Sequence, residues 1–278
     1  MFRTIGHTFE LMKVSWHVLQ KDRELILFPI MSAIGLIVML GMFFGLAAGT
    51  GTLDRLDAAS AVGTDAAEPI DYILAITLYI GSSFVVIFFN SALISAALER
   101  LRGGDPNIGS GLRAAAAHLP AIICWAVIAG TVGLILQILR NRSGGFIARI
   151  AIALVGGAWA YMTFFVVPVL VSEGSGPIGA IKRSASLFHE TWGRQVASSF
   201  GFGIVYLIAM LIAIIPAALL FFVTPIAGIA VGAITIPIAI GTVQAMEGIF
   251  KAALYEFALG EKPLEFDRDS LSGAYRAL

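Results

Sequence analysis

The chain has 278 residues, of which 58% are hydrophobic and 13% charged, and its formal net charge is zero. Soluble domains carry about 25% charged residues, so this composition indicates a protein that resides in a lipid bilayer. The balanced charge gives no support for a nucleic-acid partner. The single cysteine, Cys124, excludes an internal disulfide and a cysteine-based metal cluster, and we expect it to be a buried, inert thiol.

Six apolar runs are long enough to cross the hydrocarbon core as helices, which takes about 20 residues. Backbone groups in lipid must be hydrogen-bonded within their own segment, so each run is expected to be helical. The runs cover residues 25–48, 72–98, 119–139, 146–171, 197–223 and 227–253. The sequence therefore predicts an all-α polytopic membrane protein with one domain over residues 1–278, an N-terminal helix at 1–24 and a tail at 254–278.

The loops between these runs differ in their content of Lys and Arg. If the N-terminus is cytoplasmic, all but four of the 18 Lys and Arg residues belong to the cytoplasmic side; the four are Arg55, Arg140, Arg142 and Arg149. The positive-inside rule then predicts a plasma (inner) membrane protein with both termini in the cytoplasm. Arg149 is expected to extend to the outer head groups. The alternative is that the third and fourth runs do not cross completely.

The N-terminal segment has the apolar spacing of an amphipathic helix. Its apolar residues recur every three or four positions and share one face, namely Phe2, Ile5, Phe9, Met12, Trp16 and Leu19. We expect this helix to lie in the cytoplasmic interface with its apolar face toward the lipid. The alternative is that it continues the first span into water.

Two later segments repeat this pattern between spans. Pro177 suits the first turn of a helix, after which one face is formed by Ile178, Ile181, Ala185 and Phe188. Residues 104–119 form a weaker copy, and residues 260–278 open with the same Gly-x-x-Pro pattern. The order of inward span, Gly/Pro break, surface helix and outward span suggests an internal repeat. Arg113, Lys182 and Arg183 on the surface helices are candidates for binding lipids or a partner.

The stretch EGSGPIGAIKRSASLFHETWG, residues 173–193, resembles a motif that precedes the fifth span in a broad group of prokaryotic six-span membrane proteins. The group includes the membrane domain associated with glycerophosphodiester phosphodiesterases. The resemblance is specific at Glu173, Gly176, Pro177, Ala180, Lys182, Arg183 and Ser184. The segment SWHVLQKDRELILFPI resembles the opening of one stand-alone branch. The resemblance implies a fold and a location but no activity, since the phosphodiesterase itself has no counterpart here.

No catalytic constellation is recognisable along the chain. The histidines lack metal-site spacing, and they are His7, His17, His118 and His189. Neither a GxSxG motif nor a phosphate-binding loop is found. We therefore expect a non-enzymatic protein without a metal or another cofactor.

Polar residues inside the spans are the stronger leads, because they cost free energy in lipid and usually face the protein interior or water. Asn90, Gln244 and Glu247 could line a polar vestibule that opens to the cytoplasm. Glu247 and Lys251 can pair on one helical face, and the alternative is that this pair is purely structural.

Two functions fit these observations. The first is a protein that organises or binds membrane lipids or partners at the cytoplasmic leaflet, through the surface helices and their basic residues. A protein partner or a second copy of the chain could dock there. The second is a transporter of a small solute or lipid that uses the vestibule.

Overall fold

A computed structural model describes residues 2–62, 68–142, 145–192, 202–264 and 266. Every regular element within these residues is a helix. Six helical segments are long and apolar enough to cross a membrane: Arg23–Gly49, Pro69–Leu101, Leu119–Arg142, Phe146–Glu173, Tyr206–Val223 and Pro225–Ala258. The all-α polytopic fold predicted from the sequence is thereby confirmed.

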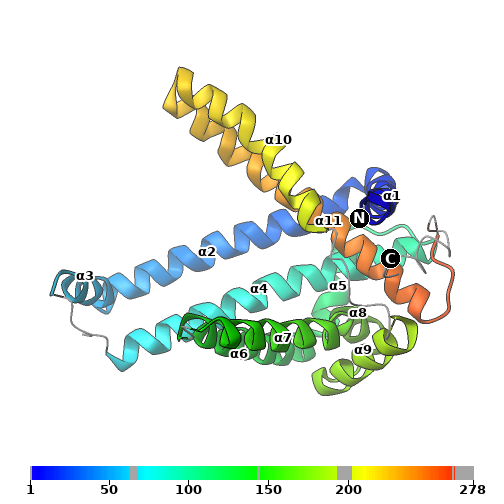
Figure 1. Cartoon of the computed structure of the whole chain (residues 1–278), viewed down its shortest axis with the longest axis horizontal. Helices are drawn as coiled ribbons and strands as arrows, with labels where there is room; N and C mark the ends of the chain where they lie inside the picture. The colour runs from blue at the N-terminus through cyan, green and yellow to red at the C-terminus, as the bar shows by residue number, and fades with distance from the viewer. Residues whose placement is uncertain (1, 63–67, 143–144, 193–201, 265, 267–278) are drawn as a thin grey trace.

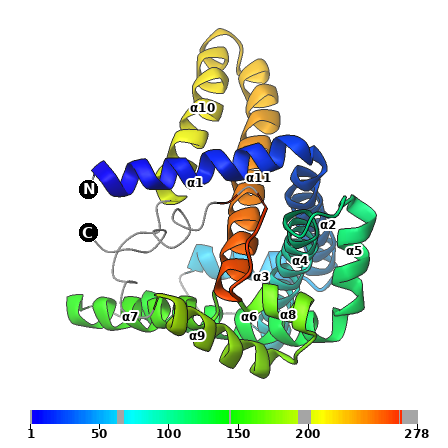
Figure 2. The ribbon, with the colours of Figure 1, turned by 90° about the vertical axis from the view of Figure 1, so that its right-hand side faces the viewer.

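The elements follow one another in the order α1 (Phe2–Lys21), η1 (Arg23–Ile26), α2 (Leu27–Gly49), α3 (Thr52–Val62), α4 (Pro69–Leu101), α5 (Ile108–Ala117), α6 (Leu119–Arg142), α7 (Phe146–Met162), α8 (Val166–Glu173), α9 (Pro177–Trp192), α10 (Phe202–Val223) and α11 (Pro225–Ala258). Helices α1, α5, α8 and α9 gather at one end of the molecule, which we call the basal end (Figures 1 and 2). Helix α3 and the turn between α10 and α11 lie at the other, distal end.

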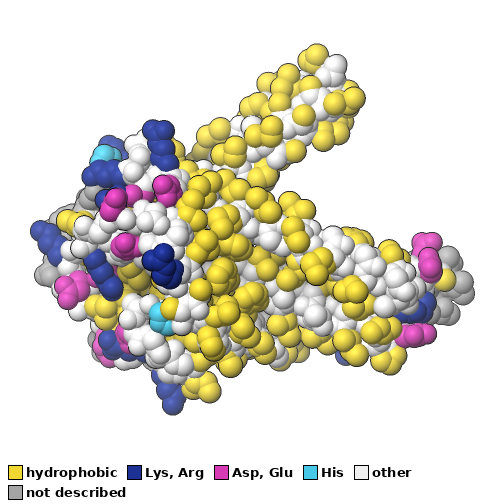
Figure 3. Space-filling view, turned by 180° about the vertical axis from the view of Figure 1, so that it is seen from behind, with side chains coloured by type: hydrophobic (Ala, Val, Ile, Leu, Met, Phe, Trp, Pro, Cys, Tyr) yellow, Lys and Arg dark blue, Asp and Glu magenta, His cyan; other side chains and the backbone are white. Residues whose placement is uncertain are grey.

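The basal end contains most of the hydrophobic core. Helices α4 and α11 have 33 and 34 residues, which is about 50 Å of helix against a hydrocarbon core of roughly 30 Å. Their basal turns pack against one another and against the short helices, burying side chains such as Leu93, Ile249, Leu254 and Phe165 completely or nearly so. Charged side chains also concentrate around this end, whereas the middle of the molecule is covered by apolar ones (Figure 3). This distribution fits a molecule embedded in a bilayer.

Helix α10 and the distal half of α11 form a hairpin, which we call the arm. Close contact within the arm depends on glycine, because a Cβ on Gly228 would come within 2.5 Å of the Phe221 backbone. The arm diverges from α2 and α4 and leaves a V-shaped opening, which we call the fork (Figures 1 and 3). Arm side chains such as Ile212 and Leu219 are more than 60% exposed, so in a bilayer they contact lipid.

Three helices end at the basal side in the same way. Gly103, Gly174 and Gly260 have positive φ angles of 90°, 64° and 85° at the ends of α4, α8 and α11, a conformation that favours glycine. After α4 and α11, the amide of the residue that follows the glycine donates a hydrogen bond to the carbonyl five residues earlier. These bonds run from Gly104 N to Glu99 O (2.9 Å) and from Glu261 N to Glu256 O (3.0 Å). A proline follows each glycine three residues later, at positions 106, 177 and 263. This recurrence agrees with the predicted repeat.

The expected fourth span, 146–171, is divided into α7 and α8, with a break at residues 163–165. The Phe165 amide donates a hydrogen bond of 2.8 Å to the buried Ser184 Oγ of α9. A side chain from another helix thus satisfies the backbone where the helix is interrupted. The expected fifth span begins at 197, but residues 193–201 lie outside the described part of the chain.

The segment between the first two spans contains a helix, α3, that the sequence did not predict. Asp71 at the start of α4 accepts hydrogen bonds from Thr52 Oγ1 (2.7 Å) and Arg55 Nη2 (2.6 Å), and these bonds attach α3 to the bundle. The hydrogen bond to Asp71 also raises the pKa of Arg55. One of the four basic residues predicted on the outer side therefore has a structural counter-ion.

Candidate functional site

A polar pocket lies at the base of the fork, where α2, α4, α10 and α11 converge. Its volume is about 170 Å³. The polar side chains that line it are Ser32, Asn90, Tyr206, Gln244, Glu247 and Lys251, and the other lining residues are Pro29, Val86, Phe89, Leu93 and Gly248. The three residues predicted to line a vestibule, Asn90, Gln244 and Glu247, thus share one pocket, although they come from two helices far apart in the sequence.

The two charged groups of the pocket neutralise one another. Lys251 Nζ lies 2.8 Å from Glu247 Oε1, so the pair expected from their spacing is formed. The Tyr206 hydroxyl donates a hydrogen bond of 3.1 Å to Glu247 Oε2. Lys251 also lies over the Phe164 ring, 5.8 Å from its centroid. The pocket therefore has an ordered ion pair and no net charge from its lining residues.

The neutral polar groups of the pocket are less well satisfied. The side chains of Ser32, Asn90 and Gln244 line the cavity, and within the described residues none of the three forms a side-chain hydrogen bond to the protein. Ser32 is buried, Asn90 is half-buried and Gln244 is exposed, and a donor or acceptor that loses its water without gaining a partner costs about 1–3 kcal/mol. Water, a lipid head group or another polar ligand can supply the partners that the protein does not.

The depth of the pocket can be counted along the helices that form it. Asn90, Gln244 and Pro29 each lie about 20 residues from the distal ends of their helices, at Pro69, Pro225 and Gly49, and about 20 helical residues span the hydrocarbon core. Three helices therefore place the pocket at one level. If the distal helix ends mark one membrane surface, this level is that of the head groups on the basal side.

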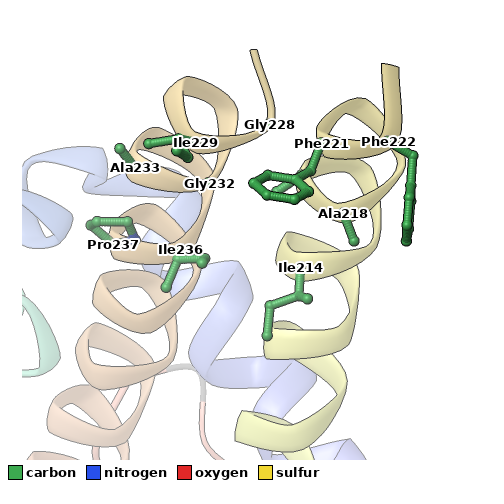
Figure 4. A pocket seen from close by; sticks show the side chains of 11 residues that line it. Ile214, Ala218, Phe221, Phe222, Gly228, Ile229, Gly232, Ala233, Ile236 and Pro237 are labelled. Atoms are coloured by element: carbon green, nitrogen blue, oxygen red, sulfur yellow. The ribbon is translucent and has the colours of Figure 1, made fainter. Parts of the chain in front are cut away.

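A second cavity, of about 670 Å³, lies between α10 and α11 in the arm (Figure 4). It is lined by apolar side chains and glycines, such as Ile214, Phe221, Gly232 and Ile236. Lipid chains can fill such a space, and its lining offers no hydrogen-bonding or charged side chain. The polar pocket is therefore the stronger candidate site.

The basic residues predicted to bind lipids or a partner are not part of the pocket. Arg113 on α5 and Lys182 on α9 are exposed at the basal end. Arg183 Nε donates a hydrogen bond of 3.2 Å to Glu173 Oε1, and Glu173 also accepts one of 2.9 Å from the Tyr255 hydroxyl. Arg183 therefore links α9 to α8, which gives this part of the predicted motif a structural role.

The surface helices bury only part of the apolar stripes seen in the sequence, including Met12 and Leu19 of α1 and Phe188 of α9. Helix α9 turns Ala180, Ser184 and Leu187 toward the protein and leaves Ile178 67% exposed. Likewise, Ser15 of α1 is fully buried while Trp16 is 42% exposed. Small residues allow the helix backbones to approach the core closely, and part of each apolar stripe remains outside, where a bilayer can cover it.

Several residues escaped the sequence reasoning. Tyr206 carries a signal that could have found it, a hydroxyl near the start of an apolar run, whereas Ser32 is an ordinary small residue in a span. Arg102 and Glu256 form an ion pair of 2.7 Å between α4 and α11, and nothing in their spacing indicates it.

Cys124 is exposed on α6, so the expectation of a buried thiol was wrong, because an apolar run in lipid has an outward face. The described residues contain no group of three or more His, Cys, Asp or Glu that could hold a metal ion.

Comparison with known proteins identifies a family. The model of a family of unknown function, DUF6159, matches residues 69–263. No curated protein and no solved structure matches the chain. The matched region runs from the first turn of α4 past the end of α11, and so contains five of the six spans and nearly all of the polar pocket. Because the match covers well over half of the chain, this membrane protein belongs to the DUF6159 family.

Proposed function

We propose that the protein binds a membrane lipid, with the lipid head group in the polar pocket and its acyl chains in the fork. The observation that carries the proposal is a set of polar side chains at the base of an opening between membrane helices that form no hydrogen bond to the described protein, namely Ser32, Asn90 and Gln244. A lipid matches this site because its polar and apolar parts are arranged in the same order.

The dimensions of the site support this assignment. A water molecule takes about 30 Å³ in the liquid, so a cavity of about 170 Å³ holds a few waters or one small head group, but not a whole lipid. The arm beside the fork carries exposed apolar side chains such as Leu207 and Leu211, so the fork offers an apolar environment for the chains. Head group and chains then occupy two adjoining spaces.

The orientation of the site follows from the distribution of basic residues. The predicted cytoplasmic segments coincide with the basal end, so the bound lipid belongs to the cytoplasmic leaflet of the plasma (inner) membrane, with both termini in the cytoplasm. Exposed Arg113 and Lys182 can attract anionic lipids to the same surface. In this proposal the protein organises lipids and is not an enzyme. Docking of a protein partner or a second copy on the basal helices, and a relationship to the membrane domain of glycerophosphodiester phosphodiesterases, stay predictions.

Transport of a lipid or small solute is the second candidate, favoured by the same polar lining. The polar residues on α11 extend from Gln244 to Lys251, which is about 10 Å of helix in a hydrocarbon core of roughly 30 Å. A polar lining of this height provides a binding site at one leaflet rather than a path across the membrane. Binding is therefore the better supported function.

The test is native mass spectrometry of the purified full chain with its co-purifying lipids. Replacing Asn90 and Gln244 together by Leu removes two of the free polar groups while keeping side chains of similar size. We expect the affinity for the lipid to fall about tenfold, which corresponds to roughly 1.4 kcal/mol, and the occupancy to fall with it. The matched control, Thr131→Leu, alters an exposed polar residue on α6 and is expected to keep the occupancy. Unchanged occupancy in the double variant would contradict the proposal.

A further inference from the structure

We infer that the lipid held by the polar pocket is a zwitterionic phospholipid whose head group carries a primary ammonium. This inference rests on the proposed function and specifies its ligand. It is carried by the charges and the free hydrogen-bonding groups of the pocket.

The net charge of the pocket favours a zwitterionic ligand. Glu247 and Lys251 are the only lining residues that carry a charge at neutral pH, and their ion pair of 2.8 Å leaves the pocket neutral. An anionic head group would add an uncompensated charge between apolar helices, and charges taken out of water need partners. A zwitterion keeps the sum at zero, with its phosphate near Lys251 and its ammonium near Glu247.

The pocket provides hydrogen-bond donors for the phosphate of such a lipid. An ammonium group has three donors, and in Lys251 one of them is directed to Glu247. The remaining donors of Lys251 and the amide groups of Asn90 and Gln244, which form no hydrogen bonds within the described residues, can donate to phosphate oxygens. Hydrogen bonds to charged groups contribute about 1.5–3 kcal/mol each, more than those between neutral groups. The phosphate is thus matched by donors from both α4 and α11.

The acceptors and the size of the pocket favour a primary over a quaternary ammonium. The pocket also contains acceptors, namely the carboxylate of Glu247 and the amide oxygens of Asn90 and Gln244. A primary ammonium can donate up to three hydrogen bonds to them, whereas a trimethylammonium can donate none and needs more room. With a cavity of about 170 Å³, the smaller, donating head group fits better.

The experiment compares head groups on matched acyl chains. The full chain, stripped of lipid in detergent, is titrated with phosphatidylethanolamine, phosphatidylcholine, phosphatidylglycerol and diacylglycerol, and occupancy is measured by native mass spectrometry. We expect phosphatidylethanolamine to bind about tenfold more tightly than the other three, which corresponds to losing one charged hydrogen bond.

A variant tests whether the ion pair determines this order. Glu247→Gln leaves one positive charge in the pocket, so phosphatidylglycerol is expected to bind more tightly than phosphatidylethanolamine. The control Glu261→Gln removes the same charge from an exposed position beyond α11 and should keep the wild-type order. If Glu247→Gln does not fold, Tyr206→Phe removes only the 3.1 Å hydrogen bond to Glu247; it should weaken phosphatidylethanolamine binding several-fold without favouring phosphatidylglycerol.

The outcomes distinguish this inference from the proposed function. If the Asn90→Leu/Gln244→Leu variant binds all four lipids as the wild type does, the pocket is not a lipid site and both ideas fail. If binding depends on the pocket but phosphatidylcholine, phosphatidylglycerol or diacylglycerol binds as tightly as phosphatidylethanolamine, the inference is overturned and the proposed function stands. Preference for phosphatidylethanolamine that is lost in Glu247→Gln and kept in Glu261→Gln supports both.

Discussion

The basal end and the arm both contain membrane-spanning helices but are packed in opposite ways. Leu254, in the basal turns of α11, is fully buried, whereas Leu219, in the arm, is 65% exposed. The arm segment Tyr206–Val223 nevertheless has the highest mean hydropathy of the six spans, at 2.7. Hydropathy therefore indicates which solvent a helix requires, and burial within the protein is decided separately. The basal end packs like a soluble core, and the arm relies on lipid to cover its side chains.

Truncating one leucine in each region should give the largest difference between the basal end and the arm. Leu254→Ala should lower the free energy of unfolding by about 2–5 kcal/mol, because it leaves a cavity in a packed core. Leu219→Ala should cost less than about 1 kcal/mol, since lipid can fill the space that the side chain leaves. Both are measured by denaturant unfolding in one detergent–lipid mixture. Equal losses would mean that the arm is packed against protein in the membrane.

The basal ion pair between Arg100 of α4 and Asp22 provides the second test. Asp22 is buried, and Arg100 donates to both of its carboxylate oxygens. Arg100→Leu leaves this carboxylate without its main partner and should cost about 3 kcal/mol. The double variant Asp22→Leu/Arg100→Leu should regain part of that loss, as a double-mutant cycle would record. Strict additivity of the two single changes would show that the pair does not hold the basal end together.

The hydrogen bond across the α7–α8 break provides a smaller effect. Ser184→Ala leaves the Phe165 amide without its acceptor and should cost about 1–3 kcal/mol. Hydrogen exchange at this amide should become faster as well. The control Ser186→Ala removes a hydrogen bond to Glu190 that lies on the exposed face of the same helix, and it should change stability by about 0.5 kcal/mol or less. A similar loss in both variants would exclude a special role for Ser184.

Labelling of introduced cysteines tests whether water reaches the polar pocket. Of the changes considered, these should alter the stability of the protein least. In a Cys124→Ala background, single cysteines at positions 90, 244 and 247 should react with a membrane-impermeant thiol reagent added from the cytoplasmic side. A cysteine at position 219 in the arm should not react, because lipid surrounds it. Protection of all three pocket positions would rule out a hydrated pocket that opens to the cytoplasm.

Part of the site could be predicted because polar residues in apolar runs are conspicuous. Asn90, Gln244 and Glu247 were found in this way, and the pairing of Glu247 with Lys251 follows from helical spacing alone. Tyr206 and Ser32 were missed, since their place in the pocket depends on how α2 and α10 approach α11. For α1 and α9 the sequence indicated part of the buried face, such as Leu19 and Phe188, but it did not indicate the small residues Ser15, Ala180 and Ser184 that are buried beside them.

The sequence by itself determined which segments are membrane helices and where the inward spans end. Transfer into lipid is a sum of contributions from neighbouring residues, and the glycines at 103, 174 and 260 act through their own backbone conformation. Only the tertiary structure decided that α7 and α8 separate, that the arm stands apart and that four helices enclose a polar pocket. These features depend on contacts between residues distant in the chain, such as Ser184 with Phe165 and Gly248 with Leu93. Local periodicity carries no information about such contacts.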